Sequence, residues 1–355
     1  MTIPRELAEF ATGYGAGSFA VGRNRIINGA MEIAQRGTSA VTATGSYPVD
    51  RFPVFYSMDG ASSMQQNSSA PAGFINSTKF TTTTADTSLS ASQYVLFEQR
   101  IEGTNIADLA WGTASAKTVT LSFWVRSSLT GTFGGSLVNN GYNRSYPFTY
   151  SISAADTWEQ KSITIAGDTT GTWLTTNGIG IRISWSLGVG SNFQGTANTW
   201  AGAEYYGTSG ETPVIGTLNA TWYITGVQLE AGSVATSFER RSYGQELALC
   251  QRYYENNYPA GSAVGSTHAD STNSGYSYRS GLTTPYQYIQ YQQRKRTTPT
   301  LTGWNGITGA SGTWRGSSSA NETLTLYANE VSACIATTAS DSLIRSGFLE
   351  VSAEL

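Results

Sequence analysis

The stretch from Trp222 to Tyr254 constrains the fold most, because it ends one domain and begins another. Residues 222–229 alternate in the period-2 pattern of a strand, in which one face is formed by Tyr223, Thr225, Val227 and Leu229. A turn at 230–233 and a charged segment at 238–241 follow. Ser242 is then a good helix N-cap, with Gln245 in the capping-box position. The sequence therefore predicts domains over 24–241 and 255–355, joined by a helix over 242–254.

The helix and the arm before the first domain both suggest contacts with other chains. Residues 1–23 are rich in glycine, and such a segment cannot bury a core of its own. We predict an attachment arm that becomes ordered on a partner; plain disorder is the alternative. On the helix, one stripe at spacings of four, three and four is formed by Tyr243, Leu247, Cys250 and Tyr254. This stripe either packs on the preceding domain or forms contacts between copies of the chain.

Composition favours an all-β protein. Charged residues make up only 13% of the 355 residues, against about 25% in ordinary globular proteins. Glycine is frequent and aromatic residues reach 12%. Short apolar alternations such as Val119, Leu121, Phe123 and Val125 recur between turn signals such as Asn140-Gly141. This pattern predicts an antiparallel β-sandwich. The net charge of −3 argues against a nucleic-acid partner.

A second, smaller β domain is expected after the helix. Alternating segments predict strands over 277–282, 286–293, 322–327, 331–336 and 344–352. The two cysteines, Cys250 and Cys334, are expected to be buried free thiols rather than a disulfide. The chain has neither a signal peptide nor an apolar run of about 18 residues. We therefore expect synthesis in a cytoplasm and no membrane insertion.

Catalytic and metal-binding motifs are missing. His268 is the only histidine, no G-x-S-x-G motif exists, and neither a zinc-ligand cluster nor a phosphate-binding glycine loop is present. Two carboxylates would suffice for a glycosidase, but the loop carboxylates are more simply turn residues or solvated charges: Asp156, Glu159, Asp168, Glu204, Glu211 and Asp270. We predict no enzymatic activity and no cofactor, and nothing in the sequence specifically indicates Ca²⁺.

Aromatic side chains in polar segments are the most promising binding residues. Sugars stack their C–H faces on aromatic rings and form hydrogen bonds with polar groups at the ring edges. Three clusters fit this chemistry. Their candidate residues are Tyr142, Arg144 and Tyr146; Trp200, Tyr205 and Tyr206; and Tyr276, Tyr278 and Arg279. For tyrosines on strands such as Tyr286 and Tyr288, cross-strand packing is the competing explanation. The basic run Arg294-Lys295-Arg296 either guards a sheet edge or contacts an acidic polysaccharide.

Six segments carry a family resemblance in the same order along the chain. They are residues 24–29, 35–38, 47–52, 99–103, 121–126 and 225–255. Together they resemble the tail fibre and receptor-binding proteins of tailed bacteriophages that contain a sandwich like that of carbohydrate-binding modules. The resemblance covers roughly residues 24–254.

The resemblance implies a jelly-roll sandwich and a virion protein made in the host cytoplasm. It also implies a homotrimer with the helix stripe near its axis. The function expected on this basis is attachment to a host surface polysaccharide, with residues 1–23 bound to other virion proteins. The alternative is a structural head, neck or tail component that contacts only proteins.

Overall fold

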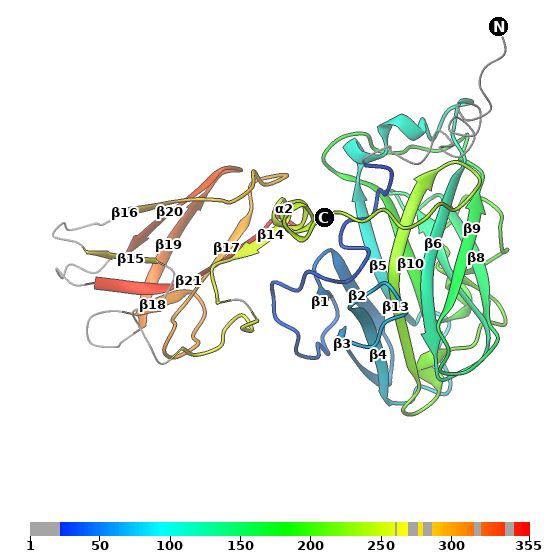
Figure 1. The fold of residues 1–355 in the computed structure, drawn as a ribbon, viewed down its shortest axis with the longest axis horizontal. Coiled ribbons are helices and arrows are strands. Elements are labelled where there is room, and N and C mark those ends of the chain that lie inside the picture. Colours follow the sequence, from blue (N-terminus) through cyan, green and yellow to red (C-terminus); the bar gives the residue numbers. More distant parts are fainter. Residues whose placement is uncertain (1–21, 260, 269–275, 280–285, 316–320, 338–343) are drawn as a thin grey trace, which may run out of the picture.

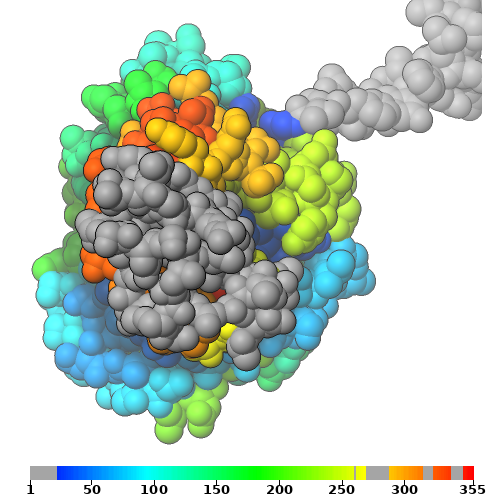
Figure 2. All heavy atoms as spheres, turned by 90° about the vertical axis from the view of Figure 1, so that its left-hand side faces the viewer, coloured from blue at the N-terminus to red at the C-terminus, as the bar shows by residue number. Residues whose placement is uncertain are grey.

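The computed structural model describes residues 22–259, 261–268, 276–279, 286–315, 321–337 and 344–355. Two β-rich bodies lie on either side of helix α2 (Tyr243–Gln251), as Figure 1 shows. Figure 2 views the molecule from the end of the C-terminal body, with the blue and green sandwich behind it. In the described part of the chain, no helix is long and apolar enough to span a membrane. The predicted arm over 1–23 lies almost entirely outside the described residues.

Two antiparallel sheets face each other in the N-terminal body. The first sheet has the strand order β1 (Ser46–Val49), β2 (Phe52–Ser57), β5 (Tyr94–Glu102), β10 (Ile179–Val189), β7 (Gly131–Val138) and β8 (Ser145–Ile152). The second has the order β3 (Ala61–Asn67), β4 (Ser77–Thr84), β13 (Thr221–Ala231), β6 (Val119–Ser127) and β9 (Glu159–Ile165). Because the chain crosses between the sheets at β5–β6–β7 and again at β8–β9–β10, the predicted all-β jelly-roll sandwich is confirmed.

Short elements complete this body at its ends. A parallel pair is formed by β11 (Gln194–Gly195) and β12 (Gly207–Thr208). Four 3₁₀ turns lie at η1 (Gly103–Asn105), η2 (Ala107–Leu109), η3 (Ser191–Phe193) and η4 (Val214–Gly216). The stretch 188–213 thus contains a turn and a two-strand ribbon.

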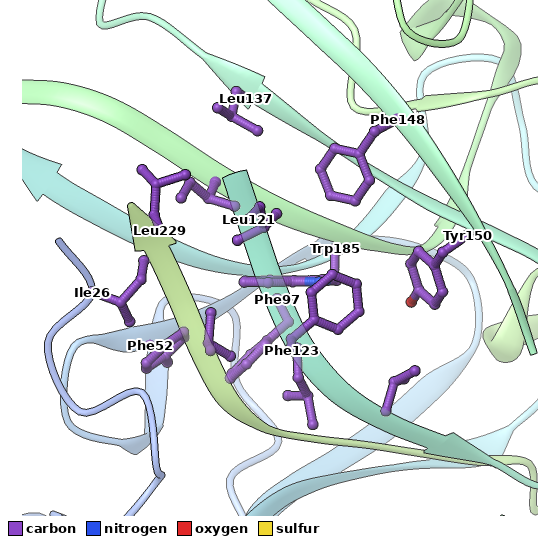
Figure 3. Close-up of a cluster of buried hydrophobic side chains, with 14 of the residues drawn as sticks. Ile26, Phe52, Phe97, Leu121, Phe123, Leu137, Phe148, Tyr150, Trp185 and Leu229 are labelled. Carbon is purple, nitrogen blue, oxygen red and sulfur yellow. The ribbon is translucent and has the colours of Figure 1, made fainter. Parts of the chain in front are cut away.

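Aromatic side chains fill the space between the two sheets. The ring of Trp185 lies 6.2 Å from that of Phe97 and 5.6 Å from that of Phe123, and Trp222 lies 6.0 Å from Phe97. All four are completely buried, and Figure 3 shows the centre of this cluster. Burying one such side chain contributes about 1.5–3 kcal/mol. The core is therefore a large part of what holds the sheets together.

Strand β13 departs from the predicted alternation at one residue. Its pairing with β6 shifts register between Thr225 and Gln228, and Gly226 has a φ of +62°. This β-bulge inserts one residue, so the side chains after it change face. Trp222 and Ile224 point to the core before the bulge, and Val227 and Leu229 after it. The prediction that Tyr223, Thr225, Val227 and Leu229 share one face was therefore wrong.

The C-terminal body is built around one long strand, β21 (Ile344–Ser352). Its eight-stranded sheet contains the path β14 (Tyr254–Asn256), β21, β18 (Thr313–Arg315), β19 (Asn321–Ala328), β20 (Ser332–Thr337) and β16 (Tyr286–Gln290), while β15 (Tyr276–Arg279) and β17 (Thr300–Trp304) also pair with β21. The sequence did not predict β14, β17 or β18. A separate core forms here around Trp314, Ile335 and Leu349.

Helix α2 confirms the capping box but not the predicted length. Ser242 Oγ accepts the N–H of Gln245, and the Gln245 side chain accepts the N–H of Ser242. The helix ends at Gln251 rather than at 254, and Tyr254 begins strand β14.

The helix stripe faces its own chain. Cys250 and Tyr254 are completely buried, and Leu247 packs with Cys250 against Ile27. Neither Cys250 nor Tyr254 can therefore lie at a contact between copies, which corrects the trimer assignment of these two residues. Of the four stripe residues only Tyr243 is largely exposed. The trimer itself stays a prediction.

The junction between the bodies is a network of charged side chains in which the carboxylates are buried. Glu354, next to the last residue of the sequence, pairs with Arg51 and, at 3.3 Å, with Arg36. Arg252 binds Glu102 through two hydrogen bonds of 2.9 and 2.7 Å. These pairs join residues of the sandwich to residues of the helix and the C-terminal body. The two bodies are consequently held by directional, charge-assisted bonds.

The basic run at 294–296 belongs largely to this junction. Lys295 is buried and pairs with Glu255 at 2.8 Å. Arg296 donates to the backbone oxygens of Ala353 and Glu354 at 2.8 and 2.7 Å. Neither residue guards an edge or faces solvent as a polysaccharide contact, so both predicted roles were wrong for them. Only Arg294 is exposed.

Candidate functional site

The six-stranded sheet carries an unusual row of charges on the face that points away from the core. In the register of β5 and β10, Arg182 lies opposite Arg100, and Ser184 lies opposite Glu98. Arg100 Nε donates to Glu98 Oε1 at 2.6 Å. We call the set Tyr94, Glu98, Arg100, Tyr142, Arg182 and Tyr206 the arginine–tyrosine face.

Arg182 is the central cation of this face and is only partly satisfied. Its Nη1 donates to the backbone oxygens of Asn139 and Asn140 at 3.0 and 3.3 Å. Its Nε is buried and has no hydrogen-bond partner among the described residues. Burial lowers the pKa of Arg182 from its ordinary value. A buried donor without a partner costs about 1–3 kcal/mol, which the hydrogen bonds of Arg182 to the two backbone oxygens partly offset.

Tyr142 covers this guanidinium with its ring. The Arg182 Cζ atom lies 4.1 Å from the centre of the Tyr142 ring, which is within cation–π range. Tyr142 has a φ of +55° and is 38% exposed, so one part of the ring contacts Arg182 while another part faces solvent. The exposed part of the ring is the surface on which a flat apolar ligand face could stack.

The loop that presents Tyr142 is held in place from both sides. The Asn139 Oδ1 atom accepts the N–H groups of Asn143 and Arg144, each at 3.1 Å. Arg144 in turn binds Asp168 through two hydrogen bonds of 2.7 Å. Burial opposes the charge of Asp168, yet the hydrogen bonds from Arg144 and Thr170 hold its pKa below the ordinary value. The ring of Tyr142 is therefore presented by a preorganised loop.

Three rings form a wall beside the charged row. Tyr94 lies 5.4 Å from Phe193 and 5.9 Å from Tyr206, and Phe193 lies 5.3 Å from Tyr206. Tyr94 and Phe193 are half-buried. Tyr206 is buried, and its hydroxyl group donates a hydrogen bond to the Glu204 carboxylate. Burial and the nearby Glu204 carboxylate raise the pKa of Tyr206 and, more weakly, of Tyr94. These phenols stay neutral and serve as hydrogen-bonding groups.

A cavity of about 330 Å³ lies at the end of the same segment 188–213. Glu211 lines it, and Glu211 Oε1 accepts the Thr208 N–H at 2.6 Å. A Cβ on Gly134 would lie 1.9 Å from that oxygen, so the carboxylate packs directly against the sheet at a residue without a side chain. Burial raises the pKa of Glu211 to about 7.

The predicted sugar-binding residues are divided between this face and the interior. Tyr142 lies on the face, and Tyr206 forms its wall. Arg144 holds the loop rather than facing a ligand. Tyr205 is half-buried and packs over Gly195.

Tyr146 and Trp200 are packing residues instead. Tyr146 is buried, and its ring lies 5.1 Å from that of Trp200. Trp200 also packs edge-on against Trp111 and Trp173, at 5.4 and 5.5 Å, and donates its indole proton to the oxygen of Ala166. Burial is the physical reason that Tyr146 is unsuited to stack on a ligand.

The third predicted cluster cannot be placed. Strand β15 contains Tyr276, Tyr278 and Arg279, but the structure describes only their backbone and not their side chains. Sequence reasoning missed Tyr94, Glu98 and Arg182. The available signal was a charged residue on the outer side of an isoleucine-rich strand, because Arg182 sits between Ile181 and Ile183.

Metal and histidine chemistry find no support in the described ranges. No group of three or more His, Cys, Asp or Glu side chains there is placed to hold a metal ion. His268 packs near the rings of Tyr258 and Phe348, at 5.9 and 5.2 Å, so it is not a free loop tip. The arginine–tyrosine face offers stacking surface, hydrogen-bond donors and a carboxylate, which suits binding of a polar, ring-shaped ligand.

Comparisons with known proteins give remote structural similarities. No family model matches the sequence, and no curated protein matches it. The structure is similar to the enzymatically active domain of bacteriophage CBA120 tailspike protein 4, with a TM-score of 0.32 and 10% identity over 59% of this chain and 22% of that chain. The protein thus spans about a fifth of the tailspike chain.

Two similar structures are described by sugar binding. One is a putative sugar binding protein from Bacteroides thetaiotaomicron, with a TM-score of 0.33 and 12% identity over 59% of this chain and all of that chain. The other is a family 11 carbohydrate-binding module from a Clostridium thermocellum cellulase, with a TM-score of 0.28 and 12% identity over 55% of this chain and 96% of that chain. At these TM-scores the similarities assign no function.

Proposed function

We propose that this chain is a non-catalytic attachment protein of a tailed-phage virion that binds host-surface glycan through the arginine–tyrosine face. The observation that carries the proposal is the placement of Tyr142. Its 38% exposed ring is fixed over a buried arginine whose Nε has no hydrogen-bond partner among the described residues. A fixed and partly exposed ring offers the flat stacking surface that the C–H face of a sugar requires.

The binding step follows from these contacts. A sugar ring stacks its C–H face on the solvent side of the Tyr142 ring, while Arg182 lies against the other side of that ring and holds it in place. Because the 139–144 loop is already ordered by Asn139 and Arg144, little conformational entropy is lost on binding.

The virion role rests on the six sequence segments that resemble phage tail fibre proteins and occur in the same order along the chain. In this role residues 1–23 attach the protein to other virion proteins, and the chain forms a homotrimer. Single sites of this kind are weak, so attachment depends on many copies on one particle.

A ring-deletion variant tests the proposed site. Tyr142→Asn removes the ring but suits the positive φ, because Asn tolerates the left-handed region. Tyr142→Phe is the matched control, since it keeps the ring and loses only the hydroxyl. On a glycan array followed by titration calorimetry, we expect Tyr142→Asn to weaken binding at least about tenfold and Tyr142→Phe to keep most of it. Equal binding by wild type and Tyr142→Asn rejects this face as the site.

A cell-binding assay tests the attachment role. Fluorescent wild-type protein is expected to decorate host cells, and enzymatic removal of surface polysaccharide should abolish the signal. Tyr142→Asn should decorate the same cells more weakly. A folded wild-type protein that binds neither the array nor any host cells would instead favour a structural virion component that contacts only proteins.

A further inference from the structure

The C-terminal body presents exposed aromatic rings on the outer side of three adjacent strands. Tyr288 on β16 is 78% exposed and Tyr327 on β19 is 57% exposed. Val331, just before β20, is also exposed. Exposed large apolar side chains gathered on one face mark an interaction site more often than scattered ones do.

The strand register puts the two tyrosines in one row. Tyr288 pairs with Cys334, and Cys334 pairs with Tyr327 on its other side. Directly opposite residues in antiparallel strands point to the same face. The two rings therefore stand on either side of Cys334, at the spacing of two strands, which is about 10 Å.

The other described side chains of this face are small or polar and uncharged. Ile289, Ala333 and Ile335 point inward to the core of this body, so their neighbours along the strands point outward. We name this outward set the tyrosine row face; its described side chains are Tyr288, Gln290, Thr323, Thr325, Tyr327, Ser332 and Cys334.

We propose that the tyrosine row face is a second glycan-binding platform, and that its ligand is an extended, neutral, β-1,4-linked hexose chain. In such a chain every second sugar turns the same face to one side, and these sugars are separated by about the distance between the two tyrosine rings. Each ring stacks on one sugar, while the Gln290, Ser332 and Thr325 side chains form hydrogen bonds with hydroxyl groups.

Charge decides between this ligand and an acidic one. Among the side chains of the tyrosine row face that the structure describes, none carries a charge, so this part of the face complements a neutral chain and gives an anionic polysaccharide no counterion. The inference rests on the proposed glycan-binding function, but it concerns a different surface on a different body of the protein. The two can therefore fail separately.

Titration calorimetry with cellohexaose and chitohexaose tests the platform, with an α-1,6-linked dextran oligomer as the linkage control. The full-length Tyr142→Asn protein serves as the background, so that binding at the arginine–tyrosine face is already weakened. Adding Tyr288→Ala or Tyr327→Ala should lower the remaining affinity at least about tenfold. Ile75→Ala is the control: Ile75 is 71% exposed on the sandwich body, away from this face, and its loss should change nothing.

Cys334 provides a second readout that does not depend on the variants. A thiol reagent should modify Cys334 in the folded protein, and bound β-1,4-linked hexaose should slow that reaction, because the thiol lies between the two rings. Dextran should give no protection.

The outcomes separate the two proposals. If neither oligosaccharide binds the Tyr142→Asn background and neither protects Cys334, the platform is overturned while the arginine–tyrosine face stands. If Tyr288→Ala and Tyr327→Ala lose binding while Tyr142→Asn alone has no effect, the platform stands and the first site falls. A self-association seen by light scattering and abolished by Tyr288→Ala would also overturn the glycan platform, because the face would then bind a second copy.

Discussion

Glu354 is the residue on which the joint between the two bodies depends most. Its carboxylate contacts Arg51 and Arg36, and the side chains of Glu354 and Arg51 are only 9% and 3% exposed. Burial opposes the charge of Arg51, but the Glu354 carboxylate outweighs it and raises the pKa of Arg51. Glu354→Gln keeps the shape of the side chain and removes its charge. It thus leaves two arginines near one neutral group.

The expected loss follows from what Arg51 retains. Removing one partner of a buried ion pair costs about 3–5 kcal/mol. Arg51 keeps its hydrogen bond to the oxygen of Arg100 at 2.7 Å and its contact with the Tyr253 ring at 3.5 Å. The amide oxygen of the new glutamine also still accepts one hydrogen bond. We therefore expect the free energy of unfolding to fall by about 3 kcal/mol, near the lower end of that range.

Urea unfolding followed by tryptophan fluorescence measures this effect. The matched control is Glu330→Gln, because Glu330 and Arg294 form an exposed pair at 3.7 Å. Such surface pairs contribute about 0–1 kcal/mol. A double-mutant cycle with Arg51→Met should show strong coupling, since removing both charges leaves no unpaired ion at that position. Additive losses in the cycle, or a Glu354→Gln protein as stable as Glu330→Gln, would refute this account of the junction.

Three further expectations concern other parts of the molecule. Burial raises the pKa of Glu211 to about 7, above its unfolded value of 4.5, so the folded state binds this proton more tightly. Stability should accordingly fall as pH rises from 4.5 towards 7, by about 2 kcal/mol after allowance for partial exposure, and urea titrations of Glu211→Gln should lack this slope. In thermal unfolding, Gly226→Ala should lower the free energy of unfolding by about 1–3 kcal/mol, because φ is positive and the new Cβ would lie 2.7 Å from an atom of the Phe74 ring. Gly244→Ala, in open space on α2, should not lower it. Ellman's reagent should modify Cys334 in the folded protein and the buried Cys250 only after unfolding, and immediate reaction of both would contradict the burial of Cys250.

The sandwich could be predicted because its signal is local. Val119, Leu121, Phe123 and Val125 alternate in the sequence and are all completely buried in the core. The same reasoning failed on β13, where Gly226 inserts one residue and reverses the face of everything after it. A bulge is decided by pairing with β6 and by the space that only glycine leaves beside Phe74 and Trp124. The alternation of apolar residues within β13 reveals neither its pairing with β6 nor the space beside the glycine.

The junction could not be predicted because its partners are far apart in the sequence. The local surroundings of Lys295 show a basic run, which usually indicates an exposed edge. Its actual partner is Glu255, and the neighbouring Arg296 is held by backbone oxygens at 353 and 354. Only the pairing of β14 and β17 with β21 brings these segments together.

Sequence reasoning identified Tyr142 of the candidate site but missed Arg182, because only local features can be read from the sequence. Tyr142 was recognised because a loop aromatic is visible in the sequence. Arg182 is visible there only as a charge between two isoleucines, and its neighbours become known when β5 and β7 are placed beside β10. Likewise, Trp200 looks like a loop residue until Trp111 and Trp173 are found packed around it. Whether an aromatic side chain faces solvent is decided by distant segments that cover it.

The rigid junction bears directly on how two weak faces can act together. Arg252 and Arg296 connect the C-terminal body to the sandwich through bonds to Glu102 and to the backbone of Asn177. In the proposed attachment, these bonds would limit the motion of the arginine–tyrosine face relative to the tyrosine row face, so that a second contact would lose little further freedom after the first. A flexible linker would instead spread the second face over a large volume and lower its effective concentration. For the proposed attachment, the charges at the junction would therefore affect whether two weak contacts add, besides their effect on stability.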